Sequence, residues 1–172
     1  MSIIALLSLP ILNPETYDVT DDTAVQKNQT ANLPKLPKSA PNIQLPSLSA
    51  APGQIIHFLL KLTLPPDSKL NEEAPNAWFI TAEDSNTWLL QGQYLSGEIK
   101  DVSCQTVIPF QLPRVCLSAE AVLAIKACLY YCSKDSSACM MKGVSFNQPL
   151  QIGTATQGSL TQVELTHSFL TN

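Results

Sequence analysis

Two of the five cysteines, Cys132 and Cys139, have the residue type and spacing best suited to chemistry in this 172-residue sequence. They flank a short polar stretch, and residues 134–137 are suited to the loop of a β-hairpin. With that loop, Cys132 lies opposite Cys139, and the same register pairs apolar residues such as Ile125 with Phe146 on one face. We therefore predict that the two sulfurs lie within bridging distance.

Three interpretations of this pair are open: reduced, half-buried thiols, a cross-strand disulfide, or a metal site. An odd number of cysteines without the spacing of a disulfide framework favours reduced thiols that act as small apolar residues. Zinc is disfavoured because four residues of strand separate Cys128 from Cys132 by about 13 Å. Cys104 and Cys116 complete no Cys-x-x-Cys motif. We predict no metal site.

The remaining reactive residue types do not assemble into a recognisable catalytic motif. His57 lies on the polar face of a predicted strand, and His167 lies near the end of the sequence. The paired acids fall in predicted loops, where carboxylates are usually solvated: Asp21-Asp22, Glu72-Glu73 and Glu83-Asp84. The sequence has no Gly-x-Ser-x-Gly elbow and no phosphate-binding glycine loop. We therefore expect a non-catalytic protein with no cofactor.

Composition limits the possible partners. The net charge is −4, the charged fraction is 14% and 13 residues are prolines. An acidic chain without a basic stripe is not expected to bind nucleic acid. The apolar run of residues 3–12 contains Pro10, is too short to span a membrane and lacks the features of a signal peptide. No membrane association is expected.

The elements that must position the cysteines are strands. Residues 53–64 alternate strictly, with Ile56, Phe58 and Leu60 on one face, as a half-buried strand requires. Residues 78–81 and 87–91 suggest a hairpin, and 94–99 a weaker strand. Pro109 within 106–112 predicts an edge or bulge position in a strand. Further strands are expected at 122–132, 140–152 and 160–169, after a short turn at Ser118.

This pattern predicts an all-β fold. Seven or eight short strands with turns between them are typical of an immunoglobulin-like antiparallel β-sandwich, with a barrel as the alternative. Residues 33–41 contain three prolines and are expected to be extended. We expect residues 1–38 to be a loosely ordered, Pro-rich extended segment and residues 39–172 to be the sandwich domain.

Several blocks of the sequence resemble the family of NHL-repeat-containing proteins that join a thioredoxin-like domain to a six-bladed NHL β-propeller. The resemblance lies in residues 33–41, 78–83, 88–93, 96–99, 129–132, 135–142 and 148–152. It implies that residues 39–172 correspond to the C-terminal β domain of that family, and that residues 1–32 are a remnant of the last propeller blade. It also implies a cytosolic location. No position matches the redox cysteines of the thioredoxin-like domain, so no catalytic residue is carried over.

Two functions follow as hypotheses. The first is a structural or interaction module whose partner is a protein, namely the thioredoxin-like and propeller part of the same family. The second is a redox accessory module, in which Cys132 and Cys139 exchange thiols with a thioredoxin-like partner. Lys134 and Lys142 are the candidates for lowering the pKa of one of these thiols.

Overall fold

The fold is built almost entirely from strands. The computed structural model describes residues 34–91, 96–103, 105–134, 138–153 and 160–170. This part of the chain contains one 3₁₀ helix, η4 (Asp84–Leu90), and ten strands. The strands are β1 (Asn42–Gln44), β2 (Leu48–Ala50), β3 (Ile55–Thr63), β4 (Ser68–Leu70), β5 (Ala77–Ala82), β6 (Ser96–Glu98), β7 (Thr106–Gln111), β8 (Glu120–Ser133), β9 (Cys139–Ile152) and β10 (Thr161–Ser168).

The larger of two sheets, here called the large sheet, is organised around the hairpin of β8 and β9. Its strand order is β1-β9-β8-β5-β6, with β2 also paired to β9 and β4 also paired to β8. The hairpin follows the predicted register, in which Ile125 lies opposite Phe146 and Cys132 lies opposite Cys139. The strands β1 and β2 run parallel to β9 along its far edge.

The second sheet, here called the small sheet, has the order β10-β3-β7. Its central strand shows the predicted alternation, with Ile56, Phe58 and Leu60 buried. β7 is antiparallel to β3, whereas β10 is parallel to it. Pro109 is exposed in β7, which is an edge strand among the described elements, as its proline predicted.

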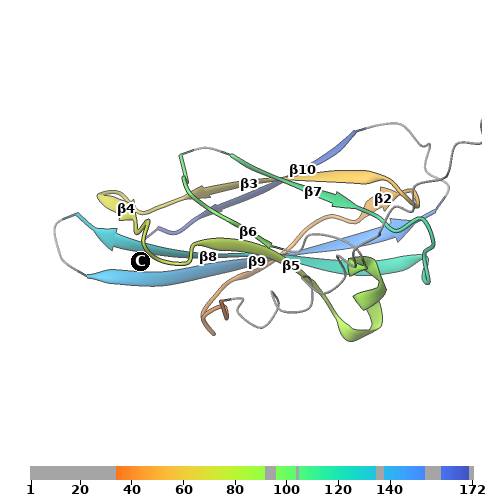
Figure 1. Cartoon of the computed structure of the whole chain (residues 1–172), viewed down its shortest axis with the longest axis horizontal. Helices are drawn as coiled ribbons and strands as arrows, with labels where there is room; N and C mark the ends of the chain where they lie inside the picture. The colour runs from red at the N-terminus through yellow and green to blue at the C-terminus, as the bar shows by residue number, and fades with distance from the viewer. Residues whose placement is uncertain (1–33, 92–95, 104, 135–137, 154–159, 171–172) are drawn as a thin grey trace, which may run out of the picture. The chain divides into compact units, whose positions relative to one another are not determined.

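The two sheets lie face to face and share one core (Figure 1). Fully buried side chains from both sheets fill it, including Phe58 and Phe110 of the small sheet and Ile125 and Phe146 of the large one. The prediction of an all-β, sandwich-like fold is confirmed. Both sheets are mixed, however, because parallel pairings add to the antiparallel framework: β1 and β2 each pair with β9 over three residues, and β10 pairs with β3 over eight.

One predicted strand is a 3₁₀ helix. Residues 87–91 were expected to pair with 78–81, but η4 occupies Asp84–Leu90 and β5 pairs instead with β6. Short polar side chains at the start of η4 favour a turn, and the Thr87 hydroxyl donates to the Asp84 carbonyl at 3.1 Å. Trp88 and Leu89 are both buried. Adjacent residues of a strand point to opposite faces, so the turn buries this pair better.

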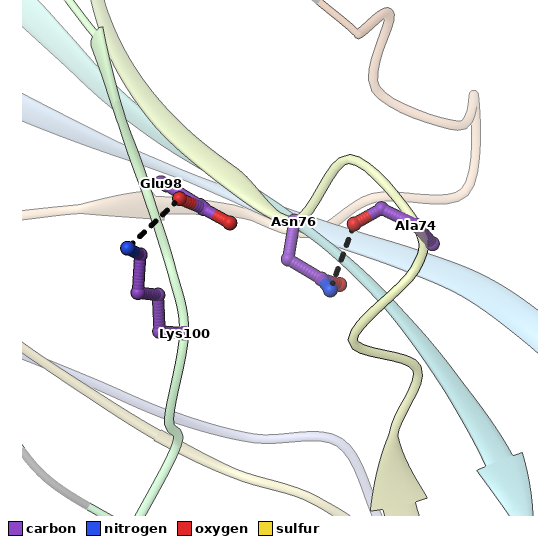
Figure 2. Close-up of polar contacts among 4 residues, drawn as sticks. All are labelled: Ala74, Asn76, Glu98 and Lys100. Carbon is purple, nitrogen blue, oxygen red and sulfur yellow. Dashed lines mark hydrogen bonds and ion pairs between the residues drawn. The ribbon is translucent and has the colours of Figure 1, made fainter.

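A buried amide fills the gap between β4 and β5 along one side of β8. The Asn76 side chain donates to the carbonyls of Asn71, at 2.6 Å, and Ala74, at 3.1 Å. Its Oδ1 accepts from the Tyr130 amide at 2.7 Å. Figure 2 shows the contact with Ala74, beside the exposed ion pair of Lys100 and Glu98 at 3.5 Å. Asn76 thus supplies the hydrogen bonds that a continuous strand would have supplied.

Part of the predicted linker packs on the large sheet. Leu36 and Pro37 are half-buried beside Gly143 of β9. A Cβ on Gly143 would lie 3.2 Å from Pro37 Cδ and would contact Leu36, so the glycine makes room for this segment. Residues 34–38 therefore lie against the sandwich, within the compact unit Leu33–Asn172. The predictions for residues 1–33 fall outside the described residues, and the domain boundary stays a prediction.

Candidate functional site

The two cysteines singled out by the sequence are brought together at the loop end of the β8–β9 hairpin. Cys132 and Cys139 are directly opposite each other, with their Cα atoms 4.0 Å apart, and a disulfide joins them. The expectation of reduced thiols is therefore replaced by the second interpretation, a cross-strand bridge. The physical reason is the hairpin register, which places the two Cβ atoms on the same face of adjacent strands.

The two sulfurs have different surroundings. Cys132 is half-buried in a strand that has β9 on one side and β4 on the other. Cys139 is exposed in β9, and β1 does not begin to pair with β9 until Ser145. No described strand covers the outer side of β9 at Cys139. The bridge thus has one enclosed end and one open end.

Lys69 is the nearest basic residue by strand register. It lies in β4, directly opposite Cys132, so both side chains are on the same face of the sheet. Lys142 pairs with Leu129, and by strand alternation it belongs to the other face. The expectation that Lys142 lies beside the thiols is therefore wrong. Sequence reasoning missed Lys69, because its neighbour is 63 positions further along the chain.

One hydrogen bond closes the base of the hairpin loop, and a second ties the loop to the residue that precedes β4. The Ser133 amide donates to the Ala138 carbonyl at 3.1 Å, and the Lys134 amide donates to the Asp67 carbonyl at 2.7 Å. Asp67 has a φ of 58°, in the left-handed region that a short polar side chain tolerates. After this turn, β4 pairs antiparallel with β8, which places Lys69 opposite Cys132 of the bridge.

Two further cysteines are free and unsuited to nucleophilic chemistry. Cys128 is buried, and burial raises the pKa of its thiol to about 11. The Cys116 thiol donates to the Pro113 carbonyl at 3.2 Å, and burial raises its pKa as well. A raised pKa lowers the fraction of reactive thiolate at neutral pH. Cys104 lies outside the described residues.

The histidines and the acid pairs do not form a catalytic group. The His167 ring lies edge-on to Phe169, with centroids 4.6 Å apart, and burial lowers its pKa. It lines a cleft of about 400 Å³ with Lys142, and no carboxylate is among the described lining residues. Both described acid pairs, Glu72-Glu73 and Glu83-Asp84, are exposed. In the described ranges, no three His, Cys, Asp or Glu side chains are grouped to hold a metal ion.

An apolar surface, here called the outer patch, covers part of the small sheet on the side away from the core. It consists of Ile55, Leu59, Val107, Pro109 and Leu160, and His57, which pairs with Pro109, lies among them on the same face. Strand alternation sets its direction, because Ile56, Phe58, Ile108 and Phe110 point into the core. Ile55 is 46% exposed, Val107 52% and Leu160 61%. Gln162, Glu164 and Lys61 form a polar border on β10 and β3.

In the part of the chain that the structure describes, no helix has the length and apolar character needed to cross a membrane.

No protein-family model matches the chain. It is 89% identical over 167 residues to NHL repeat-containing protein 2 of Gallus gallus, which is 97% of this chain and 23% of the relative. It is 50% identical over 161 residues to the protein of the same name from Homo sapiens, and 51% identical over 160 residues to that from Bos taurus. In these two comparisons the match covers 94% and 93% of this chain, and 22% of each relative.

The chain therefore spans less than a quarter of the length of these curated relatives. Its β-sandwich and the Cys132–Cys139 hairpin lie within this shared segment, and the resemblance inferred from the sequence blocks is confirmed: the chain is homologous to one segment of NHL repeat-containing protein 2.

Proposed function

We propose that this β-sandwich is a non-catalytic interaction module that packs against the remaining part of the longer NHL-repeat-containing relatives. The observation that carries the proposal is the outer patch, an apolar surface with a polar border. Exposed apolar surfaces of this kind are typical of docking sites, since leaving them in water is unfavourable. The expected occupant is protein, because the chain matches only 22–23% of its relatives' length.

Two features support docking on the face of the small sheet rather than at its edge. Pro109 has no N–H to offer an incoming strand and interrupts the hydrogen-bonding edge of β7. Val107 and Ile55, in contrast, project from the face. A partner would therefore bury side chains of the outer patch instead of extending the sheet. The resemblance to the family implies that this partner is the thioredoxin-like and propeller part.

A calorimetric titration tests this proposal. The complete 172-residue chain is titrated with a polypeptide comprising the part of the Gallus gallus relative that the chain does not match. We expect binding, and we expect Val107→Asp to weaken it at least tenfold, because a carboxylate would have to be buried. Thr166→Asp is the control, since Thr166 is exposed on the same face but outside the outer patch.

Either of two results would reject the proposal. Absence of binding by the wild-type chain would remove the interaction with the rest of the relative. Equal affinity of wild type and Val107→Asp would remove the outer patch as the docking surface. Thr166→Asp should bind as the wild type does.

The exposed disulfide favours a second function, a redox accessory module that exchanges thiols with a thioredoxin-like partner. The resemblance implies a cytosolic location, where reducing systems keep most thiols reduced and disulfides are typically transient. A bridge with one exposed cysteine is accessible to such exchange. Repeating the titration under oxidising and reducing conditions separates the two functions. Affinity that is independent of redox state supports docking alone, whereas affinity that changes supports the redox function.

A further inference from the structure

We infer that the Cys132–Cys139 bridge reacts with a defined polarity: an incoming thiolate attacks Cys139, and Cys132 leaves as the thiolate beside Lys69. This inference rests on the second proposed function and deepens it. It assigns a separate role to each sulfur and adds Lys69, a residue outside the hairpin, to the site.

The direction of attack follows from the strands around the bridge. A thiolate displaces a disulfide sulfur in line with the S–S bond, so it must approach from beyond the sulfur that it attacks. A thiolate that attacks Cys132 would approach from the side of β4, which pairs with β8 at this point. A thiolate that attacks Cys139 would approach from the outer side of β9, which no described strand covers there. Access therefore favours Cys139.

The position of Lys69 favours the same polarity. Directly opposed residues of adjacent strands have Cβ atoms about 5 Å apart, within reach of a lysine side chain. Lys69 is exposed and lies opposite Cys132. A nearby ammonium group stabilises a thiolate, and a more stable thiolate is a better leaving group. No described lysine is paired with Cys139, whose partner in the register is Cys132. Lys142, in the same strand as Cys139, is on the other face of the sheet.

The reaction balances with a thiol reductant. The incoming thiolate forms a sulfur–sulfur bond with Cys139 Sγ, and the old S–S bond breaks with its electron pair on Cys132 Sγ. That thiolate then takes a proton from water. A second thiolate, either the partner thiol of a dithiol or a second monothiol, attacks the external sulfur and releases Cys139 as a thiolate. The chain gains two electrons, and the reductant becomes a disulfide.

The first experiment identifies the attacked sulfur without any protein partner. The oxidised full chain is mixed briefly with glutathione, quenched in acid and alkylated, and the modified peptides are identified by mass spectrometry. We expect glutathione on Cys139 and the alkyl group on Cys132 in a large majority of singly reacted molecules. Equal labelling, or glutathione mainly on Cys132, would overturn the inference.

The second experiment tests Lys69. We expect Lys69→Met to slow the reaction with glutathione about two- to fivefold by removing the charge that stabilises the leaving thiolate. Lys69→Arg should retain most of the rate. Lys61→Met is the matched control, because Lys61 is an exposed strand lysine of the small sheet. An unchanged rate in Lys69→Met would remove Lys69 from the site.

A third measurement guards against effects on folding. In Cys139→Ser, the pH dependence of Cys132 alkylation gives the pKa of its thiol, which we expect below the usual value of about 8.5. Adding Lys69→Met should raise it again. An unshifted Cys132 pKa would contradict the inference. These experiments use small reagents and need no protein partner. If the protein partner failed to exchange thiols with the bridge, the redox function would be rejected, but the polarity of the bridge would still have been determined.

Discussion

The two sheets of the sandwich are held together by different means. The large sheet has a long hairpin, a disulfide at the loop end of that hairpin and the Asn76 side chain bridging two strands. The small sheet has three strands and no disulfide among its described residues, and its outer face carries the outer patch. The difference indicates that the small sheet depends on the shared core for its stability. It also leaves the small sheet with an apolar face available for docking.

The largest expected effect tests whether the two sheets form one cooperative unit. Phe58→Ala in the small sheet and Phe146→Ala in the large sheet each remove a fully buried ring. Each should lower the free energy of unfolding by about 3–5 kcal/mol. Urea unfolding followed by tryptophan fluorescence measures this. Trp78 is in the large sheet, and Trp88 is in η4, which follows β5.

An unchanged fluorescence midpoint in Phe58→Ala would show that the large sheet is stable without the small one. Val107→Ala is the matched control, because Val107 is half exposed on the opposite face of the small sheet. It should change the free energy of unfolding by less than about 0.5 kcal/mol.

Removing the polar bridge of the large sheet should have the next largest effect. Asn76→Ala leaves the Tyr130 amide without its acceptor and removes the side-chain donor from the Asn71 and Ala74 carbonyls, each of which keeps one backbone donor. We expect a loss of about 2 kcal/mol in the free energy of unfolding and faster hydrogen exchange at the Tyr130 amide. Asn42→Ala, at an exposed position of β1, is the control. Unchanged exchange at Tyr130 would contradict the bridging role.

A glycine pair tests the contact of residues 34–38 with the large sheet. A Cβ on Gly143 would lie 3.1 Å from the Ala127 carbonyl oxygen and would contact Leu36, whereas a Cβ on Gly153 meets nothing within 4 Å. Gly143→Ala should therefore cost about 1–2 kcal/mol of stability, and Gly153→Ala almost nothing. Thermal unfolding measures both, and limited proteolysis should show earlier cleavage near Leu36 in Gly143→Ala. Equal behaviour of the two variants would exclude the contact as a source of stability.

The smallest expected effect is a pH dependence from His167. Burial lowers its folded-state pKa below the ordinary value of 6.5, so the unfolded chain binds the proton more readily. The contribution of His167 to the free energy of unfolding is therefore full above pH 6.5 and is lost as the pH falls toward the lowered pKa. The wild type should lose stability between pH 7.5 and 5 more than His167→Gln does. His57→Gln is the control, and identical profiles of wild type and His167→Gln would contradict the assignment.

Local patterns carried much of the prediction. The alternation of β3, the edge position of Pro109 and the β8–β9 register all depend on neighbouring residues or a single tight loop, and all three are confirmed. β1, β2 and β4 were not predicted, because a three-residue strand is too short to show a period; β6, which has the same length, was predicted only as part of the longer range 94–99. η4 was missed because Trp88 and its neighbours have strand propensity, which the turn-forming residues before them override.

The candidate site could be predicted only where it depends on residues close together in the sequence. The pairing of Cys132 with Cys139 follows from one hairpin, whereas the pairing with Lys69 depends on how β4 returns to β8. The outer patch likewise needed the position of β10, because Leu160, which precedes β10, is brought toward Ile55 by the parallel pairing that begins with Thr161 and Ile56. Contacts between distant segments leave no periodic signal in the sequence.

The parallel pairing of β3 with β10 has a consequence for how the protein is made. Ile56 pairs with Thr161, a residue 105 positions later, so the small sheet cannot be completed until the last strand has left the ribosome. The large-sheet hairpin can form earlier, from residues that are close in sequence. Pairings over such separations are slow to form, and during that interval the apolar face of β3 is uncovered. Nascent chains stalled before residue 161 should therefore bind chaperones that recognise extended apolar segments.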